Sequence, residues 1–311
     1  MGRERDSMKK LYITGANGFV GHHLARIVAE GGFGDCALHT MPDGLDIRDG
    51  KALLASLASI QPDWVIHLAA RSFVPDSFAN PRETLDVNLF GTLNLLCALR
   101  EMKFRGRFLY VSSGDVYGVV PEAALPVTES RWPEPRNPYA ASKVSAETLC
   151  LQWHRSEQLD VIVARPFNHI GPGQGERFVV PALARQVALI AAGLQEPTLA
   201  VGDIDVTRDF SDVRDVVRAY AALLRHGQGG QTYNVCSGRE VTIRFILQTL
   251  CALAQVEPAV VQDSARLRPS EQRRMVADCG RLRQDTGWEP AISLETSLQQ
   301  ILDQFRTSQT P

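Results

Sequence analysis

The chain has 311 residues, of which 44% are hydrophobic and 22% charged, and its formal net charge is -2. This composition is typical of a folded protein with one large or two ordinary domains, and it argues against a mostly disordered chain. Because basic and acidic residues nearly balance and are spread along the sequence, we expect no nucleic-acid partner. Residues 1–10 are polar, and no apolar run approaches the roughly 20 residues of a membrane span. We therefore expect a cytoplasmic protein with no membrane partner.

The first predicted strand, Lys9–Thr14, leads into a glycine-spaced turn and then into a predicted helix at 22–30. In this turn Gly15 would allow a sharp bend, Gly18 would let the backbone approach a pyrophosphate, and Gly21 would let helix and strand pack closely. The phosphates would lie at the positive end of the helix. This order of elements predicts a dinucleotide-binding site, although a tight strand-to-helix connection can show the same spacing.

Further along the chain, runs typical of strands alternate with runs typical of helices. The strand–helix pairs are 36–40 with 49–60, 64–68 with 82–102 and 108–112 with 137–158, and another strand is expected at 161–165. The run at 64–68 is mostly apolar without alternation, as in parallel strands that are covered on both faces. The repeated units predict an α/β fold with a doubly wound parallel sheet of Rossmann type.

The pattern loosens after Arg165, where Pro and Gly interrupt residues 166–175. Residues 212–224 are again typical of a helix and 231–235 of a strand. We therefore expect a dinucleotide-binding domain of residues 1–167 and 206–236. Residues 168–205 and 237–311 would form a smaller, discontinuous α+β substrate-binding lobe.

A Tyr and a Lys four residues apart lie in the predicted helix at 137–158, and a Ser follows the strand at 108–112. Tyr139 and Lys143 would share one helix face, with the ammonium beside the phenol. A phenol titrates near pKa ~10, and an adjacent cation favours the phenolate, so Tyr139 could exchange a proton near neutral pH. Ser113 could hold a substrate oxygen. Together with the glycine turn, this trio predicts hydride transfer.

Ligands of an open α/β sheet bind beyond the carboxyl ends of its strands, and three consecutive predicted strands end in polar or glycine-rich loops. After the third strand come Leu68, Ala69 and Ala70, where the small residues would let a cofactor pass close to the backbone. Residues 112–118 follow the fourth strand and 165–174 follow the fifth. The sequence therefore predicts the site at this edge of the sheet.

The six cysteines are scattered and lie mostly in apolar stretches, without a CxxC or an HExxH motif. His22 and His23 are adjacent and would point to different faces of a helix, unlike a ligand pair. We therefore expect buried thiols and no metal.

Seven motifs resemble those of one enzyme family and occur in its order. They are TGANGFVG, HLAA, SSGDVYG, YAASK, RPFNHIGPGQ, TRDFSDVRDV and TGWEP. Over nearly its whole length the chain thus resembles the nucleotide-sugar branch of the extended short-chain dehydrogenase/reductases. Within that branch, the RPFNHIGPGQ loop and the run Arg268-Pro269-Ser270-Glu271 are most similar to GDP-4-keto-6-deoxy-D-mannose reductases, which form GDP-D-rhamnose.

The resemblance implies a role for each matching position, and it also implies a homodimer. Tyr139 would donate the proton, Lys143 would hold the nicotinamide ribose and lower the phenol pKa, and Ser113 would hydrogen-bond the sugar C4 oxygen. The positions that match cofactor contacts are Gly15, Asn17, Gly18, Phe19, Val20, Gly21, Asp46, Ile47, Leu68, Ala69, Ala70 and Lys143. Those that match contacts to the GDP-linked sugar are Asn168, Val179, Arg208, Arg268 and Glu271.

Three of the candidate positions have a second interpretation. Arg208 would face the substrate diphosphate as a planar charged fork, or would only form a surface ion pair. Asp46 matches an adenine contact, but Asp46 or Asp49 could equally cap a helix. Asp115 would either orient the sugar in the catalytic site or satisfy the N–H groups of a turn.

The expected cofactor is NADP(H), with NAD(H) possible. An NAD-specific site would carry an acid at the end of the second strand, where residues 38–41 read Leu-His-Thr-Met. Asp35 precedes this strand and Asp43 follows it, so we expect neither to reach the ribose. The missing negative charge leaves room for a 2′-phosphate.

The implied reaction is reduction of the C4 ketone of GDP-4-keto-6-deoxy-D-mannose to GDP-D-rhamnose by NAD(P)H. A 4-epimerase acting on a UDP- or GDP-linked sugar with the same trio is the alternative, and net consumption of NADPH separates the two. A GDP-mannose 4,6-dehydratase is less expected, because similar dehydratases carry Thr-Asp-Glu or Thr-Ser-Glu where this chain has Ser113-Gly114-Asp115. A catalytically inactive cofactor-sensing protein would not need the intact trio.

Overall fold

The structure is a computed structural model that describes residues 8–263 and 272–307. Within these residues the larger lobe is built on a parallel sheet of six strands. In spatial order the strands are β2 (Cys36–Thr40), β1 (Lys9–Thr14), β3 (Trp64–His67), β4 (Arg107–Val111), β5 (Asp160–Pro166) and β9 (Thr232–Val235). The strand order reverses beside β1, which is the switch point of a doubly wound sheet. The expected fold class is confirmed.

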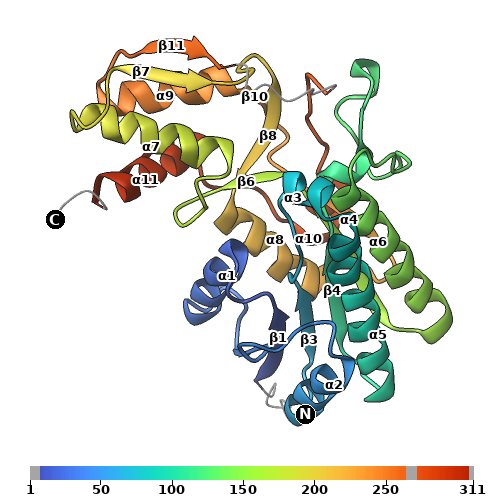
Figure 1. Cartoon of the computed structure of the whole chain (residues 1–311). Helices are drawn as coiled ribbons and strands as arrows, with labels where there is room; N and C mark the ends of the chain where they lie inside the picture. The colour runs from blue at the N-terminus through green and yellow to red at the C-terminus, as the bar shows by residue number, and fades with distance from the viewer. Residues whose placement is uncertain (1–7, 264–271, 308–311) are drawn as a thin grey trace.

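Helices cover both faces of this sheet (Figure 1). On one face lie α1 (Phe19–Ala29), α8 (Val213–His226) and α10 (Gly280–Thr286), and on the other α2 (Gly50–Ile60), α5 (Gly91–Glu101) and α6 (Pro138–Glu157). In β1, Leu11 and Ile13 belong to the core beneath α1 and α8, whereas Tyr12 belongs to the core beneath α2, α5 and α6. All three side chains are fully buried, which is why the strand sequences are apolar without alternation.

The helix expected at 82–102 is present as a continuous helical run, with a π turn inside it. The chain forms α4 (Pro81–Leu85), a π-helical turn η1 (Asp86–Phe90) and α5, preceded by the short α3 (Val74–Ala79). A π turn adds one residue to a helix without ending it. Residues 86–90 contain no Pro or Gly that would mark this turn in the sequence.

Side-chain caps begin two helices at the edges of the site. Asn137 caps α6 by accepting a hydrogen bond from the Ala140 N–H at 2.7 Å, and Pro138 fits the first helical position. Asp49, rather than Asp46, caps α2 by accepting from the Ala52 N–H at 3.0 Å. These caps fix where α2 and α6 start.

A smaller lobe carries its own sheets and core. Its elements are β6 (Asn168–Ile170), α7 (Val179–Ala191), β7 (Thr198–Val201), β8 (Thr207–Asp212), β10 (Glu240–Thr242), α9 (Ile243–Ala254), β11 (Ala259–Gln262) and α11 (Leu294–Thr307). One sheet has the order β10-β8-β6, and β7 pairs with β11. The helices α7, α9 and α11 pack together over a separate apolar cluster. Residues 275–288, by contrast, contribute Met275 and Trp288 to the core of the larger lobe.

Two short 3₁₀ turns, η2 (Gly114–Tyr117) and η3 (Glu122–Ala124), follow β4. The first of them carries residues of the candidate site. No helix in the described part of the chain is long and apolar enough to span a bilayer.

Candidate active site

The glycine turn lies against the loop that follows β3. Gly15 has φ +75°, and a Cβ placed on it would lie 2.7 Å from the Ala69 backbone nitrogen. A Cβ on Gly21 would lie 2.3 Å from the Ala16 carbonyl oxygen, whereas a Cβ on Gly18 would meet only the Gly15 oxygen at 3.3 Å. The turn thus joins β1 to α1 through a bare backbone cradle at the helix N-terminus. Such a cradle fits the diphosphate of a dinucleotide.

A buried histidine that sequence reasoning missed holds this cradle together. The Thr92 hydroxyl donates to the Asn88 carbonyl at 2.6 Å, so its oxygen accepts from His67 Nε2 at 2.9 Å. His67 Nδ1 then accepts from the Thr14 hydroxyl at 2.7 Å, and the Thr14 oxygen accepts from the Ala69 N–H at 3.1 Å. Each hydrogen bond in this chain has one donor and one acceptor when the imidazole is neutral, with its proton on Nε2. Burial lowers the pKa of His67 to about 3, with the Lys143 charge as a smaller cause.

This buried imidazole predicts a specific acid sensitivity. An unfolded His has a pKa near 6.5, so between that value and about 3 the unfolded chain binds a proton that the native His67 does not. Stability is therefore lost as pH falls through this window, by about 2 kcal/mol from neutral pH to about pH 5. His67→Gln keeps one donor and one acceptor but does not titrate. We expect its melting temperature to fall less than that of the wild type between neutral pH and pH 5, and equal losses would contradict the assignment.

The candidate proton donor and its neighbouring cation are both buried on α6. Tyr139 is 8% exposed and Lys143 is 4% exposed. Lys143 Nζ donates to the Val111 carbonyl at the end of β4, at 2.8 Å, and lies 5.9 Å from the centroid of the Tyr139 ring. Burial lowers the pKa of Lys143 to about 8, which leaves much of the ammonium charged at neutral pH.

The phenol keeps its proton in this environment. Burial raises the pKa of Tyr139 far above its usual value, the Asp115 charge raises it further, and a hydrogen bond with the Ser113 side chain lowers it. The expectation that Lys143 brings this pKa toward neutrality is therefore not met. Loss of hydration is the largest cause, and the Lys143 ammonium donates to the Val111 carbonyl. Tyr139 is a phenol with a proton available to donate.

The loop after β4 brings Ser113 and Asp115 to the same place. Ser113 Oγ accepts from the Asp115 N–H at 3.2 Å, so Ser113 caps the turn η2. Solvent reaches the Asp115 side chain, yet surrounding protein removes enough hydration to raise the pKa of its carboxyl, while Arg208 lowers it. Asp115 therefore lies within electrostatic reach of both Tyr139 and Arg208.

The chain resembles characterised nucleotide-sugar enzymes throughout its length. Residues 43–301 match the family model described as GDP-mannose 4,6 dehydratase. The chain is 51% identical to the GDP-6-deoxy-D-mannose reductase of Pseudomonas aeruginosa, with 96% of this chain and 98% of that protein aligned. The chain belongs to the nucleotide-sugar branch of the extended short-chain dehydrogenase/reductases.

Solved structures of family members share this architecture. The structure of RMD from Pseudomonas aeruginosa complexed with NADPH superposes with a TM-score of 0.89 at 49% identity, covering 96% of this chain and 99% of that one. Thermus thermophilus UDP-glucose 4-epimerase in complex with NAD superposes with a TM-score of 0.82 at 29% identity, covering 96% of this chain and 99% of that one. Both reductases and epimerases of the branch are thus built on this fold.

In this family member, the turn and the loop after β2 are joined by a side-chain contact. Asn17 Nδ2 donates to Asp43 Oδ1 at 2.8 Å, so the Asp43 carboxylate reaches the glycine turn, which we did not expect. Asp46 forms an exposed bidentate ion pair with Arg48, and Ile47 is buried in the core. Asp46 therefore pairs with Arg48 and does not cap α2.

The candidate substrate residues lie on the smaller lobe. Asn168 is exposed in β6, Val179 is 45% exposed at the start of α7, and Arg208 is partly buried in β8. Because β6 and β8 are paired with Asn168 opposite Phe210, Asn168 and Arg208 lie on neighbouring strands. Arg268 and Glu271 fall outside the described residues.

A second network missed by sequence reasoning connects the π turn to the catalytic helix. Asn88 is buried in η1, where its Oδ1 accepts from the Arg71 N–H at 2.8 Å and its Nδ2 donates to Ser142 Oγ at 2.9 Å. Ser142 Oγ in turn donates to the Tyr139 carbonyl at 2.6 Å. The network fixes the first turn of α6 against the loop after β3. The available signal was an Asn among the apolar residues 87, 89 and 90.

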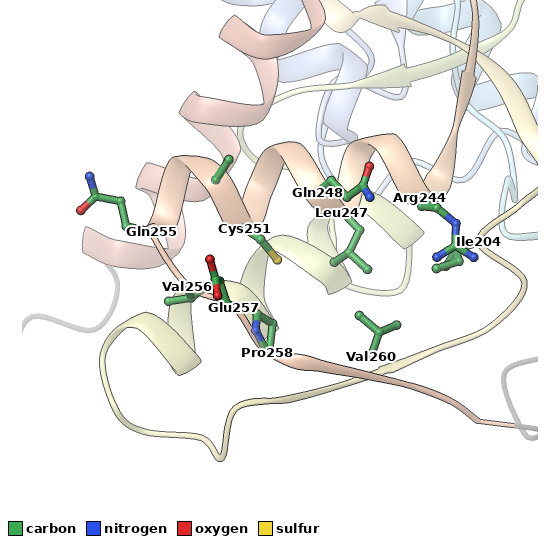
Figure 2. Close-up of a pocket in the computed structure, with 11 residues that line it drawn as sticks. Ile204, Arg244, Leu247, Gln248, Cys251, Gln255, Val256, Glu257, Pro258 and Val260 are labelled. Carbon is green, nitrogen blue, oxygen red and sulfur yellow. The ribbon is translucent and has the colours of Figure 1, made fainter.

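The smaller lobe also contains a pocket of about 570 Å³ between α9 and β11 (Figure 2). Its lining includes Leu247, Cys251 and Val260 and shares no residue with the predicted site. The Arg244 guanidinium at its edge already forms a bidentate ion pair with Asp205. The lining offers no counterpart of the glycine cradle or of the buried Tyr–Lys pair, so we place the chemistry at the strand ends.

Proposed function

We propose that this protein reduces the C4 ketone of GDP-4-keto-6-deoxy-D-mannose to GDP-D-rhamnose with NADPH. The observation that carries the proposal is the protonated, buried Tyr139 beside Lys143 and Ser113, in a chain 51% identical to a GDP-6-deoxy-D-mannose reductase. Reduced nicotinamide, when bound, supplies the hydride.

Each catalytic side chain has one task in this proposal. Ser113 hydrogen-bonds the ketone oxygen, and Tyr139 donates its proton to that oxygen as negative charge develops on it. Lys143 holds the nicotinamide ribose, and its positive charge stabilises the phenolate that proton donation leaves behind. Asp115 orients the sugar, and Arg208 with Asn168 binds the substrate diphosphate.

The cradle fits a dinucleotide cofactor, with NADPH preferred and NADH accepted. Gly15, Gly18 and Gly21 would hold the diphosphate, with Leu68, Ala69 and Ala70 on the opposite side. The strand β2 carries no acid, and Asp43, whose carboxylate contacts the turn, already accepts a hydrogen bond from Asn17. The related Pseudomonas aeruginosa structure, which contains NADPH, supports this preference.

Position 114 argues against dehydration. A Cβ on Gly114 would lie 3.0 Å from the Phe167 ring, so a side chain there would have to displace that ring. Asp115 is one methylene shorter than the Glu of similar dehydratases, and a misplacement of about 1 Å can cost roughly 10²-fold in rate. The reaction therefore ends at reduction of a ketone that another enzyme has made.

The test is a substrate screen that follows absorbance of the reduced nicotinamide. We expect stoichiometric NADPH consumption with GDP-4-keto-6-deoxy-D-mannose, and less or none with UDP- or dTDP-linked 4-keto sugars. Incubation with GDP-mannose and catalytic NADP⁺ should leave the sugar unchanged by mass spectrometry. Efficient loss of water would instead show a dehydratase, and interconversion of C4 epimers without net NADPH use would show an epimerase.

We also propose that residues 1–167 and 206–236 hold the cofactor while 168–205 and 237–311 hold the sugar nucleotide. Two exceptions are Arg208 in β8, which would contact the substrate, and residues 275–288, which pack in the larger lobe. A homodimer would cover the exposed apolar side chains of Phe78 and Phe90, which lie on segments next to α6.

None of the six cysteines forms a disulfide, in keeping with a reducing, cytoplasmic location.

A further inference from the structure

An ion pair is buried directly behind the catalytic helix face. Arg165 lies near the end of β5. Its Nε donates to Glu147 Oε1 at 3.0 Å, and its Nη2 donates to Glu147 Oε2 at 2.7 Å. The two side chains are 6% and 4% exposed. In this bidentate geometry each carboxylate oxygen of Glu147 accepts a hydrogen bond from the guanidinium.

The pair is fixed from the side of Arg165 as well. The Arg165 guanidinium carbon lies 4.8 Å from the centroid of the Tyr117 ring, and the Tyr117 hydroxyl donates to Asn234 Oδ1 at 2.7 Å. Glu147 on α6 and Tyr117 in η2 thus contact this guanidinium on β5, and Asn234 on β9 holds the Tyr117 hydroxyl. Glu147 has little freedom to leave its position.

A buried ion pair of this kind is weak evidence for stability. Removing two charges from water costs several kcal/mol per ion, and well-packed apolar residues often stabilise a fold equally well. The position of Glu147 suggests what the pair does instead. Glu147 is one helical turn after Lys143, so the carboxylate and the ammonium lie along the same helix face.

We propose that Glu147, held in place by Arg165, is a positioning residue that keeps Lys143 charged at the pH at which the enzyme works. The catalytic consequence rests on the proposed reductase function, whereas the effect on cofactor binding does not. Lys143 needs such support because only 4% of it is exposed to water. The Val111 carbonyl accepts from one of its three N–H donors and supplies part of that support.

Among the described residues, Glu147 is the carboxylate that supports the charge of Lys143. From its own helix Tyr139, Glu147 and Cys150 face it, from β4 the Tyr110 ring lies 5.2 Å from Nζ, and from β3 His67 interacts with it. Burial lowers the Lys143 pKa, and the charge of Glu147 has the largest effect in raising it again. The phenols and His67 are neutral at working pH, so they do not replace this charge.

Glu147→Gln tests the proposal because the amide keeps the size and one acceptor while losing the charge. In the wild type we expect kcat to fall as pH rises through about 8, where Lys143 loses its proton. Removal of a nearby opposite charge shifts a pKa by about 1–3 units. The basic limb of the kcat profile should therefore move to lower pH by at least about one unit.

NADPH affinity gives a second readout that does not depend on turnover. Fluorescence titration at several pH values should show that the variant loses affinity at a lower pH than the wild type. If the wild type binds NADPH but reduces no GDP-linked ketone, the proposed function fails, and the shift in the binding profile still decides the role of Glu147.

Two further variants separate electrostatics from folding. Asp160→Asn removes the carboxylate of the Arg107–Asp160 pair, which joins β4 and β5 at 2.8 Å at the opposite edge of the sheet, and it should leave both profiles in place. Glu147→Gln combined with Arg165→Met removes the whole ion pair and leaves no unpaired buried charge, so it tests the pair as a unit even where the single variant unfolds. A folded variant of either kind with the wild-type pH profile in both assays would overturn the proposal.

Discussion

Tyr139→Phe is expected to reduce turnover by about 10²–10⁴-fold while NADPH still binds with nearly unchanged affinity. The substitution removes the transferable proton and keeps the ring that packs beside Lys143. Because the pKa of Tyr139 is raised by burial, the wild-type phenol is fully protonated at neutral pH and no other group supplies that proton in the same position. Steady-state kcat with the GDP-linked ketone and a cofactor titration measure the two effects.

Tyr110→Phe is the matched control. The Tyr110 ring also lies beside Lys143, but its hydroxyl is buried without a hydrogen-bond partner and touches no substrate in our assignment. This variant should keep kcat within a few-fold of the wild type. If Tyr139→Phe also stayed within a few-fold, Tyr139 would not be the proton donor.

The second large effect is expected from Gly15→Ala, which should weaken NADPH binding by at least about 30-fold. The left-handed conformation at φ +75° costs an L-residue about 1–2 kcal/mol, and a Cβ at 2.7 Å from the Ala69 nitrogen adds overlap worth about 1–3 kcal/mol. The variant relieves both by moving the turn away from Ala69, and cofactor binding must restore the strained geometry. Isothermal titration of NADPH measures the loss.

Gly31→Ala is the control that tests the cost of a positive φ without a close contact to the cradle. Gly31 has φ +81° at the end of α1, and no atom lies within 4 Å of its added Cβ. This variant should lower the melting temperature slightly and leave NADPH affinity unchanged. Equal affinity losses in the two variants would show that general strain, and not the cradle, is responsible.

The sequence alone determined the parts of this protein that depend on local pattern. Strands such as β1 are apolar without alternation because both faces are covered, and this pattern is visible in one dimension. The glycine turn and the Tyr139–Lys143 spacing are equally local, since a turn conformation and a helix face depend on residues a few positions apart. Fold class and candidate chemistry could both be predicted from these short-range signals.

Only the tertiary structure decided how distant residues complete the site. Asp43 reaches Asn17, His67 links Thr14 to Thr92, and Arg165 pairs with Glu147, in each case across 18 or more positions of sequence. The π turn η1 inside the expected helix belongs here too, because residues 86–90 contain no Pro or Gly that would mark it. Hydrogen bonds and burial between such residues depend on how the strands and helices pack, and they set the pKa values of Lys143 and Tyr139. The spacing of apolar residues along the sequence does not predict that packing. These charges and contacts are therefore known only from the folded chain.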